Sequence, residues 1–229
     1  EVTSPEFTKG KAKRGAKAGK ASDVLGITIS HPERVYYPDQ KISKLDVARY
    51  YEAVAEVMLP HVADRPLALV RCPGGIGSQC FFQKRAGAGL PEAIHEISIG
   101  DRTEESVLVI DSPEGLVSLV QRGVLEIHIW GSHLKTIEKP DLLVFDFDPD
   151  PAVKWPEVAR AAFEMRDFLA DLGLKSFAKT TGGKGLHVVV PIKPVLEWDA
   201  VKEFTRLVST RFSGRAPDRF LVNMSKAKR

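Results

Sequence analysis

An apolar run ends in two alternating carboxylates at Leu142-Leu143-Val144-Phe145-Asp146-Phe147-Asp148. Side chains alternate across a β-strand, so Asp146 and Asp148 are predicted to project from one face, opposite Phe145 and Phe147. Carboxylate oxygens held in this way suit Mg²⁺ or Mn²⁺. Two such ions can stabilise the attacking and leaving oxygens of phosphoryl transfer. The stretch therefore predicts a strand that carries a two-metal site.

Two other interpretations stay open on these residues alone. In the first, the strand simply ends in a solvated acidic turn, Asp148-Pro149-Asp150-Pro151, and holds no metal. In the second, the pair belongs to a sugar-nucleotide glycosyltransferase, because those enzymes also bind a metal through Asp-x-Asp. That alternative predicts binding of uridine-diphosphate sugars. The neighbouring motifs have to decide between the three.

A glycine-rich turn follows further along the chain, Lys179-Thr180-Thr181-Gly182-Gly183-Lys184-Gly185-Leu186-His187. It is not a Walker A loop, which has a longer glycine spacing and leads into a helix. Backbone N–H groups, the Thr181 hydroxyl and the Lys184 ammonium are nevertheless groups that can bind a triphosphate. In the strand that follows, His187 is predicted to share a face with Val189. The alternative is a plain hairpin, in which the glycines only make the turn.

A third strand also has a polar face, Glu126-Ile127-His128-Ile129-Trp130. Its isoleucines occupy one face, which leaves Glu126, His128 and Trp130 on the other. Successive strands often pair, so His128 is predicted to lie near Asp146. A lone histidine is usually structural, but polar faces on three strands favour one shared site.

The pattern around these motifs predicts an α+β fold, with a mixed or antiparallel sheet flanked by helices. A helix is expected to begin after Ser43, which forms a capping-box pattern with Asp46, and to end at Pro60. The other expected helices are 112–123, 155–172 and 198–212, and the expected strands are 67–71, 80–84, 106–111, 125–130, 142–148, 175–180 and 186–192. We expect residues 23–123 to form an N-terminal part and residues 124–229 the catalytic core.

The net charge of +3 is concentrated at the N-terminus. Residues 1–22 carry six basic and two acidic side chains, a net +4, so the remaining residues sum to −1. Their composition predicts a flexible basic tail or linker. Any DNA contact by the folded part would therefore need locally clustered cations.

The cysteines and the hydropathy pattern indicate where in the cell the protein is expected. Cys72 and Cys80 have seven residues between them, which matches neither a zinc site nor a disulfide framework and favours a reducing cytoplasm. No apolar run approaches the roughly 20 residues that span a bilayer, and no signal peptide is recognisable. We expect a soluble, cytoplasmic bacterial protein without membrane association.

Together these motifs resemble the polymerase domain of bacterial ATP-dependent DNA ligase D, a member of the archaeo-eukaryotic primase superfamily. Three motifs in order carry the resemblance: His128-x-Trp130, Phe145-Asp146-Phe147-Asp148-Pro149 and Thr181-Gly182-Gly183-Lys184-Gly185-Leu186-His187. It extends over nearly all of residues 24–229, including His31-Pro32-Glu33-Arg34-Val35-Tyr36-Tyr37-Pro38, Arg65-Pro66, Arg71-Cys72-Pro73 and Phe81-Phe82-Gln83-Lys84.

The resemblance implies a fold and an activity. The fold would have an RRM-like catalytic core of the primase-polymerase type and a smaller N-terminal subdomain. The activity would be nucleotide addition at DNA ends and gaps during non-homologous end joining, with two Mn²⁺ or Mg²⁺ ions and NTP or dNTP substrates. Implied partners are DNA ends with a 5′-phosphate, the end-binding protein Ku and an ATP-dependent ligase domain, either fused or associated.

The resemblance also implies roles for individual residues. Asp146 and Asp148 would be the metal ligands, with His128 as a further catalytic residue. The incoming triphosphate would be surrounded by His128, Thr181, Lys184, His187 and Arg229. The 5′-phosphate of the downstream strand would be held by Arg34 and Lys44. The template would be positioned by Arg71, Phe81, Phe82 and Lys84, with an aromatic face stacked on a base. Alternation leads us to expect that either Phe81 or Phe82 is a core residue.

Two departures from the family pattern matter. Thr181 stands where many relatives have serine, which keeps the hydroxyl. The third catalytic carboxylate of the family lies in a strand shortly beyond Ser225-Lys226-Ala227-Lys228-Arg229 and is absent from this sequence. A non-catalytic module that binds DNA ends and 5′-phosphates therefore remains an alternative function.

Overall fold

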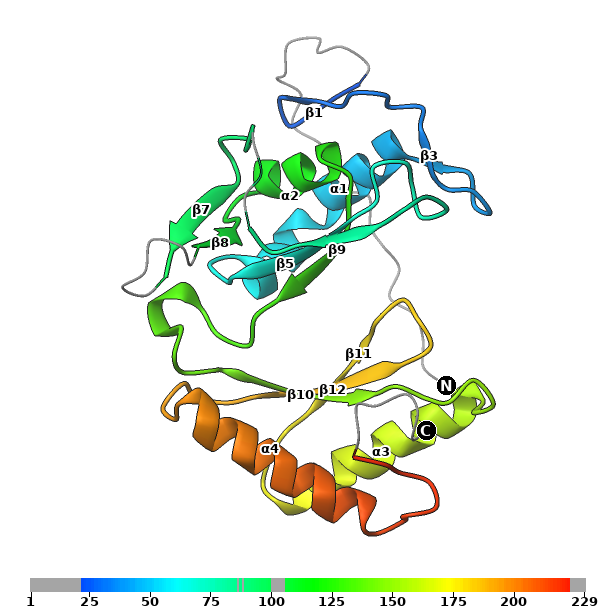
Figure 1. Cartoon of the computed structure of the whole chain (residues 1–229), viewed down its shortest axis with the longest axis vertical. Coiled ribbons are helices and arrows are strands. Elements are labelled where there is room, and N and C mark those ends of the chain that lie inside the picture. The colour runs from blue at the N-terminus through cyan, green and yellow to red at the C-terminus, as the bar shows by residue number, and fades with distance from the viewer. Residues whose placement is uncertain (1–21, 86, 88, 100–105, 223–229) are drawn as a thin grey trace, which may run out of the picture.

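A computed structural model describes residues 22–85, 87, 89–99 and 106–222 of the chain. They form two lobes, each a β-sheet with helices on one face, and the open faces of the sheets are turned toward each other (Figure 1). We call residues 22–129 the N-terminal lobe, residues 142–222 the C-terminal lobe and residues 130–141 the joint. Within the described residues, the chain passes between the lobes only at the joint.

The sheet of the N-terminal lobe is built around β5, which pairs antiparallel with β6, β8 and β9, while β7 pairs with β8. The strands are β5 (Leu67–Arg71), β6 (Phe81–Gln83), β7 (His95–Ser98), β8 (Ser106–Val109) and β9 (Val124–Ile129). Helices α1 (Lys44–Val62) and α2 (Pro113–Gln121) cover one face, where Leu67 and Leu69 pack with Leu116 and Leu119. The opposite face is left open toward the C-terminal lobe (Figure 1).

Two short hairpins complete this lobe. They are β1 (Asp23–Val24) with β2 (Ile27–Thr28), and β3 (Val35–Tyr37) with β4 (Ile42–Ser43). Val24 and Tyr36 from these hairpins are buried against Val47 of α1 and Val117 of α2. The hairpins therefore form a second small core on the outer side of the helices.

The start of α1 confirms the predicted capping box. The Ser43 hydroxyl accepts the Asp46 N–H, and the Asp46 carboxylate accepts the Ser43 N–H. The predicted end at Pro60 is wrong, because the helix continues to Val62. A proline in the last turn removes only its own N–H donor, and the Ala63 N–H still closes the turn on the Leu59 carbonyl at 2.8 Å.

The C-terminal lobe is a three-stranded antiparallel sheet in the order β10-β12-β11. Its elements are β10 (Leu142–Phe147), α3 (Trp155–Asp171), β11 (Phe177–Thr180), β12 (Leu186–Pro191) and α4 (Trp198–Ser213). Both helices pack on one face, where Phe145 and Val188 meet Leu169 and Phe212. The order β-α-β-β-α matches the first five elements of a ferredoxin-like βαββαβ unit, in agreement with the expected RRM-like core.

Several sequence predictions need correction. Residues 124–129, assigned from the sequence to the catalytic core, form β9 and pair with β5 in the N-terminal lobe. Strand β7 was not predicted. Cys72 and Cys80, expected to be unpaired, form a disulfide with their Cα atoms 4.4 Å apart. This pairing arises because β5 and β6 are antiparallel neighbours that bring the two ends of the intervening loop together.

Two further expectations concern the ends of the chain and membranes. Nearly all of the predicted tail, residues 1–22, lies outside the described residues, as does Arg229. Among the helices that the structure describes, none has both the length and the apolar character that crossing a membrane requires.

Candidate active site

Strand β10 has the alternation predicted from its sequence. Leu143 and Phe145 are buried against the helices, whereas Val144 and Asp146 are exposed on the open face of the sheet. Asp148 follows the end of the strand and is also exposed. Both aspartates also line a large cavity along the outer edge of β10, which continues between α3 and α4 on the covered side of the sheet. Both carboxylates are therefore accessible at this edge of the sheet.

Strand β12 places a histidine directly opposite the first aspartate. Asp146 and His187 are cross-strand partners, and Nε2 of His187 lies 3.5 Å from Oδ1 of Asp146. Burial lowers the pKa of His187, Asp146 opposes this shift, and the charges of Lys179 and His128 add to it. The neutral imidazole therefore predominates at pH 7, in a position to donate or accept one hydrogen bond.

The glycine-rich turn closes the hairpin of β11 and β12 beside the end of β10. The Thr181 hydroxyl donates to the Gly185 carbonyl at 3.3 Å, and it accepts the Gly183 N–H at 3.4 Å. A Cβ atom at Gly185 would lie 2.5 Å from the Phe147 carbonyl oxygen and 3.7 Å from Oδ1 of Asp146. Only glycine fits at this point, because any side chain would push the turn away from the carboxylate.

The lysine of the turn, Lys184, is exposed. It lines a small cavity together with Asp150, in the loop between β10 and α3, and Trp155, the first residue of α3. An ammonium, a hydroxyl and a run of glycine N–H groups thus gather at one end of the sheet, next to the two aspartates.

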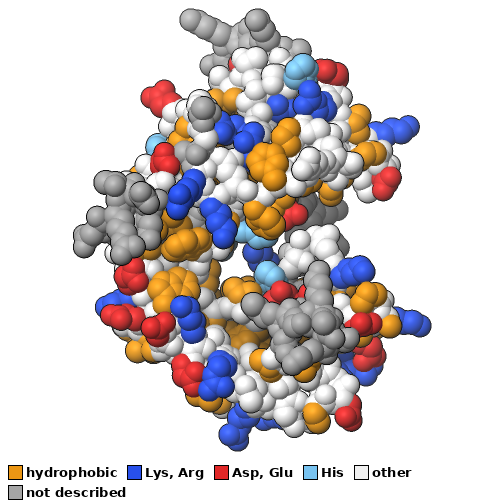
Figure 2. Space-filling view, in the orientation of Figure 1, with side chains coloured by type: hydrophobic (Ala, Val, Ile, Leu, Met, Phe, Trp, Pro, Cys, Tyr) orange, Lys and Arg blue, Asp and Glu red, His pale blue; other side chains and the backbone are white. Residues whose placement is uncertain are grey.

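His128 reaches the site from the opposite lobe. Its strand pairs with β5 and not with β10, so the pairing predicted for it is wrong. It nevertheless lies close enough to His187 for its charge to lower the pKa of that residue. Its Nε2 is 2.8 Å from Oε2 of Glu126, and its ring is 6.0 Å from that of Phe82. Figure 2 shows the hollow between the lobes, with histidine side chains on both sides.

Both phenylalanines of β6 are exposed. Phe81 is 44% exposed and Phe82 is 69% exposed, so the expectation that one of them is a core residue is wrong. The reason is that β6 is a three-residue strand at the edge of its sheet. The Arg71 guanidinium lies 5.3 Å from the centre of the Phe81 ring, and its Nε donates to the Arg122 carbonyl at 2.9 Å.

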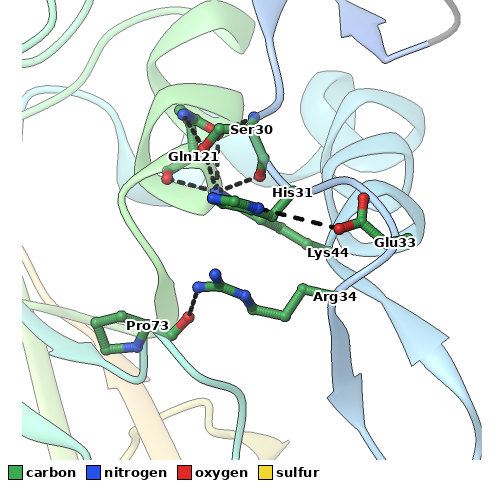
Figure 3. Close-up of polar contacts among 7 residues, drawn as sticks. All are labelled: Ser30, His31, Glu33, Arg34, Lys44, Pro73 and Gln121. Atoms are coloured by element: carbon green, nitrogen blue, oxygen red, sulfur yellow. Dashed lines mark hydrogen bonds and ion pairs between the residues drawn. The ribbon is translucent and has the colours of Figure 1, made fainter.

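A cluster of basic side chains lies at the start of α1 (Figure 3). We call Lys44 and Arg34 with their oxygen partners the cation site. Lys44 is only 4% exposed, and its ammonium donates to the Gln121 carbonyl at 2.8 Å, to Oε1 of Gln121 at 2.9 Å and to the Ser30 carbonyl at 3.1 Å. Beside it, Arg34 donates Nη1 to the Pro73 carbonyl at 2.7 Å. Burial, with a smaller effect of Arg34, lowers the pKa of Lys44 to about 8.

These cations are held by neutral oxygens. Within the described part of the chain, no carboxylate forms an ion pair with Lys44 or Arg34. Arg34 and Arg71 both act electrostatically on Tyr36, and Arg122 acts on Arg71. Residues 23–229 are nearly neutral overall, so contact with DNA requires a local cluster of cations. The fold provides such a cluster here.

Three residues of these sites were not singled out from the sequence. Gln121 and Ser30 fix Lys44, and Gln121 Nε2 also donates to the Ser30 hydroxyl at 2.9 Å. Arg122 extends the cation cluster. Nothing in the sequence marks them, because Gln121 and Arg122 sit at the end of an ordinary amphipathic helix and the contacts to Ser30 span 91 residues.

The donor set of the aspartates suits a hard divalent cation. Asp146 and Asp148 offer only carboxylate oxygens, and Mg²⁺ or Mn²⁺ commonly takes one or two carboxylates and completes its shell with water and substrate phosphates. Two carboxylates are within that number, so their chemistry fits the protein's share of such a site. Among the described residues, no group of three or more His, Cys, Asp or Glu side chains is arranged to hold a metal.

The two-lobed α+β arrangement, with a carboxylate pair on the open face of an RRM-like sheet, is that of a primase-polymerase domain. The family model for the LigD primase-polymerase domain matches residues 43–229, and the chain belongs to this family. It is 38% identical over 217 residues to the multifunctional non-homologous end joining protein LigD of Pseudomonas aeruginosa, covering 94% of this chain and 26% of that protein.

Other relatives agree with this assignment. Over 220 residues the chain is 32% identical to the multifunctional non-homologous end joining DNA repair protein LigD of Mycobacterium tuberculosis, covering 92% of this chain and 29% of that protein. The chain thus spans between a quarter and a third of the length of these relatives. A solved structure of the polymerase domain from Mycobacterium tuberculosis Ligase D in complex with DNA superimposes with a TM-score of 0.79 and 31% identity, over 89% of this chain and 74% of that one.

Proposed function

We propose that the chain catalyses metal-dependent addition of nucleotides at DNA ends and gaps, as an end-processing step of non-homologous end joining. The observation that carries this proposal is the pairing of Asp146 with His187 on an open sheet face, with Gly185 of the glycine-rich turn packed against the same carboxylate. Carboxylates and a triphosphate-binding turn within one site are what nucleotidyl transfer requires.

In this proposal the C-terminal lobe binds the nucleotide. Asp146 and Asp148 would hold two Mn²⁺ or Mg²⁺ ions, which lower the pKa of the primer 3′-hydroxyl and stabilise charge as pyrophosphate leaves. The glycine N–H groups, Thr181 and Lys184 would orient the triphosphate, and the neutral imidazole of His187 would add one hydrogen bond. From the opposite lobe, His128 would contact the same triphosphate, and Arg229 would complete the set.

The N-terminal lobe would bind the DNA. Phe81 and Phe82 present exposed aromatic faces on which template bases can stack, and Arg71 and Lys84 would neutralise the template backbone. Arg34 and Lys44 would bind the 5′-phosphate across a gap. The Lys44 ammonium already donates its three N–H groups to oxygens of Gln121 and Ser30, so a bound phosphate would replace one of these hydrogen bonds.

The names of the relatives support proposals about partners. Non-homologous end joining proteins act on broken DNA, so we propose that the chain works on ends brought together by Ku and supplies an ATP-dependent ligase domain, fused or associated, with ends to seal. We propose the bacterial cytoplasm, at the nucleoid, as the location. Membership of the LigD family lends no support to a sugar-nucleotide transferase.

Replacing both aspartates tests the proposal. Asp146→Ala combined with Asp148→Ala should lower primer extension on a gapped duplex with NTP and Mn²⁺ by about a thousandfold or more, because the metal ligands are gone. Binding of 5′-phosphorylated gapped DNA, measured by fluorescence anisotropy, should change by no more than about twofold, since the cation site lies in the other lobe. Asp199→Ala, which removes a fully exposed carboxylate of the same lobe, is the matched control.

Two outcomes would reject the assignment. Extension by the pure double variant would show that the aspartates do not hold the catalytic metals. A wild-type protein that binds the gapped duplex but never lengthens the primer would favour the alternative, a non-catalytic module for DNA ends and 5′-phosphates.

A further inference from the structure

The joint between the lobes is a structured connection. The Leu134 N–H donates to the Asp64 carbonyl of the N-terminal lobe at 2.8 Å. In the other direction, the indole N–H of Trp198 in α4 donates to the Ile137 carbonyl at 2.8 Å. The joint is therefore hydrogen-bonded to both lobes and does not behave as a loose tether.

One buried ion pair crosses the joint. Arg65, in the turn between α1 and β5, is 4% exposed and donates Nη1 and Nη2 to Oδ1 and Oδ2 of Asp141 at 2.7 and 2.6 Å. The Asp141 carbonyl accepts the Ile192 N–H at 2.8 Å, just beyond the end of β12. Nε2 of His133 lies 3.4 Å from the same carboxylate. The pair thus connects the N-terminal lobe to the residue that immediately precedes β10.

The geometry of this pair restrains rotation as well as distance. A planar guanidinium that makes two parallel hydrogen bonds to one carboxylate fixes the angle between them. The more extensive contacts between described helices and strands all lie within one lobe or the other. Among the described helices and strands, extensive packing between the lobes does not oppose a change in the angle between the two sheets.

We infer that Arg65 and Asp141 are positioning residues, which hold His128 of the N-terminal lobe in register with Asp146 and His187 of the C-terminal lobe. The role of the pair in fixing the angle between the lobes does not depend on the proposed function, whereas its effect on kcat does. A site divided between two lobes is sensitive to their angle, because a displacement of about 1 Å at reacting atoms can lower a rate about 100-fold.

The test measures lobe separation and turnover in the same proteins. Nitroxide labels attached to ketone-bearing residues at positions Glu52 in α1 and Lys202 in α4, both exposed, leave Cys72 and Cys80 unmodified. Electron–electron double resonance then gives the distribution of distances between the lobes in the full chain. Gap filling with NTP and Mn²⁺ gives kcat and the KM for the nucleotide.

The variants separate the pair across the joint from pairs within a lobe. Asp141→Asn removes the charge with little change of shape, and Arg65→Lys keeps the charge but loses the two parallel hydrogen bonds. The matched control is Glu164→Gln, which removes a carboxylate that binds Arg219 at 3.0 Å entirely within the C-terminal lobe.

We expect Asp141→Asn and Arg65→Lys to broaden the distance distribution and to lower kcat about tenfold. The KM for the nucleotide should stay within about twofold, because the aspartates and the glycine-rich turn remain together in one lobe. The Glu164→Gln control should retain the wild-type distribution and kcat.

A wild-type distance distribution in a folded Asp141→Asn or Arg65→Lys protein overturns the inference, whatever its kcat. Should Asp141→Asn fail to fold, Arg65→Lys, which leaves no charge unpaired, decides the question. A wild-type protein that does not extend primers overturns the proposed function alone, because the distance measurement requires no turnover.

Discussion

The cation site around Lys44 and the carboxylate site around Asp146 are organised in opposite ways. Lys44 is buried, and neutral oxygens of its own lobe already surround its ammonium. The Asp146 side chain is 59% exposed, and among the described residues it forms an ion-pair contact only with a histidine that is largely uncharged at neutral pH. The first site is closed by its own hydrogen bonds, one of which a bound phosphate would replace, whereas the second needs cations from solution to complete it. Loss of a supporting contact should therefore affect binding in the N-terminal lobe and turnover in the C-terminal lobe.

Apart from the loss of both aspartates, the largest effect should come from Gly185→Ala. The new Cβ would lie 2.5 Å from the Phe147 carbonyl, so the glycine-rich turn must move away from β10. We expect nucleotide addition to fall about 100-fold and binding of 5′-phosphorylated DNA to stay unchanged. Gly214→Ala, where the nearest atom is at an ordinary 3.4 Å, is the control. Full activity of Gly185→Ala would mean that the turn does not need its place beside Asp146.

Opening the disulfide should weaken the N-terminal lobe. Cys72→Ser with Cys80→Ser, or reduction of the wild type, should lower the free energy of unfolding by about 2–3 kcal/mol. The closed loop carries the Pro73 carbonyl that binds Arg34, so the affinity for 5′-phosphate should also decrease. Denaturant unfolding with and without reductant measures the first effect. Equal stability of the oxidised and reduced wild type would show that the disulfide does not stabilise the N-terminal lobe.

A smaller effect is expected from Lys44→Met. Loss of the ammonium leaves the Gln121 and Ser30 oxygens without their donor and removes one phosphate contact. The affinity ratio between 5′-phosphate and 5′-hydroxyl gapped DNA should fall about tenfold, with addition to blunt ends unaffected. Lys41→Met, which removes an exposed lysine nearby, should keep the ratio. An unchanged ratio in Lys44→Met would assign phosphate binding to Arg34 alone.

The smallest effect concerns pH. The pKa of Lys44 is lowered to about 8, so its charge is present below that pH and is lost above it. The phosphate itself is fully ionised above pH 7, since its second pKa is about 6. A bound phosphate favours the ammonium, so the 5′-phosphate affinity ratio should fall only about threefold between about pH 7 and 9. The ratio of Lys44→Met should be flat over this range; a parallel fall would point to another group.

Local sequence patterns predicted most of the elements. The alternation in β10 and β12 and the capping box of α1 depend on neighbouring residues, and the structure confirms them. The pairing of β9 with β5 could not be read in this way, because it joins residues about 60 positions apart and competes with the nearer partner β10. The disulfide was missed for the same reason, since it depends on how β5 and β6 pair.

The candidate site was only partly predictable. The aspartates and the glycine-rich turn are motifs with a local signature, and they lie together as expected. The contacts of Gln121 with Lys44 and of Arg65 with Asp141 could not be predicted in this way, because each joins residues that are distant in sequence and exists only in the folded protein. The exposure of both Phe81 and Phe82 follows from the edge position of β6, which alternation within the strand does not reveal.

Among the described residues, the chain passes between the lobes once, and this bears on how the protein folds during synthesis. The described strands and helices of the N-terminal lobe all precede residue 130, and no later residue of the described part belongs to its two hydrophobic clusters. This lobe can therefore fold on the ribosome while the aspartate strand is still being translated. Arg65 is then already in place when Asp141 emerges, so the C-terminal lobe docks onto an N-terminal lobe that is already folded.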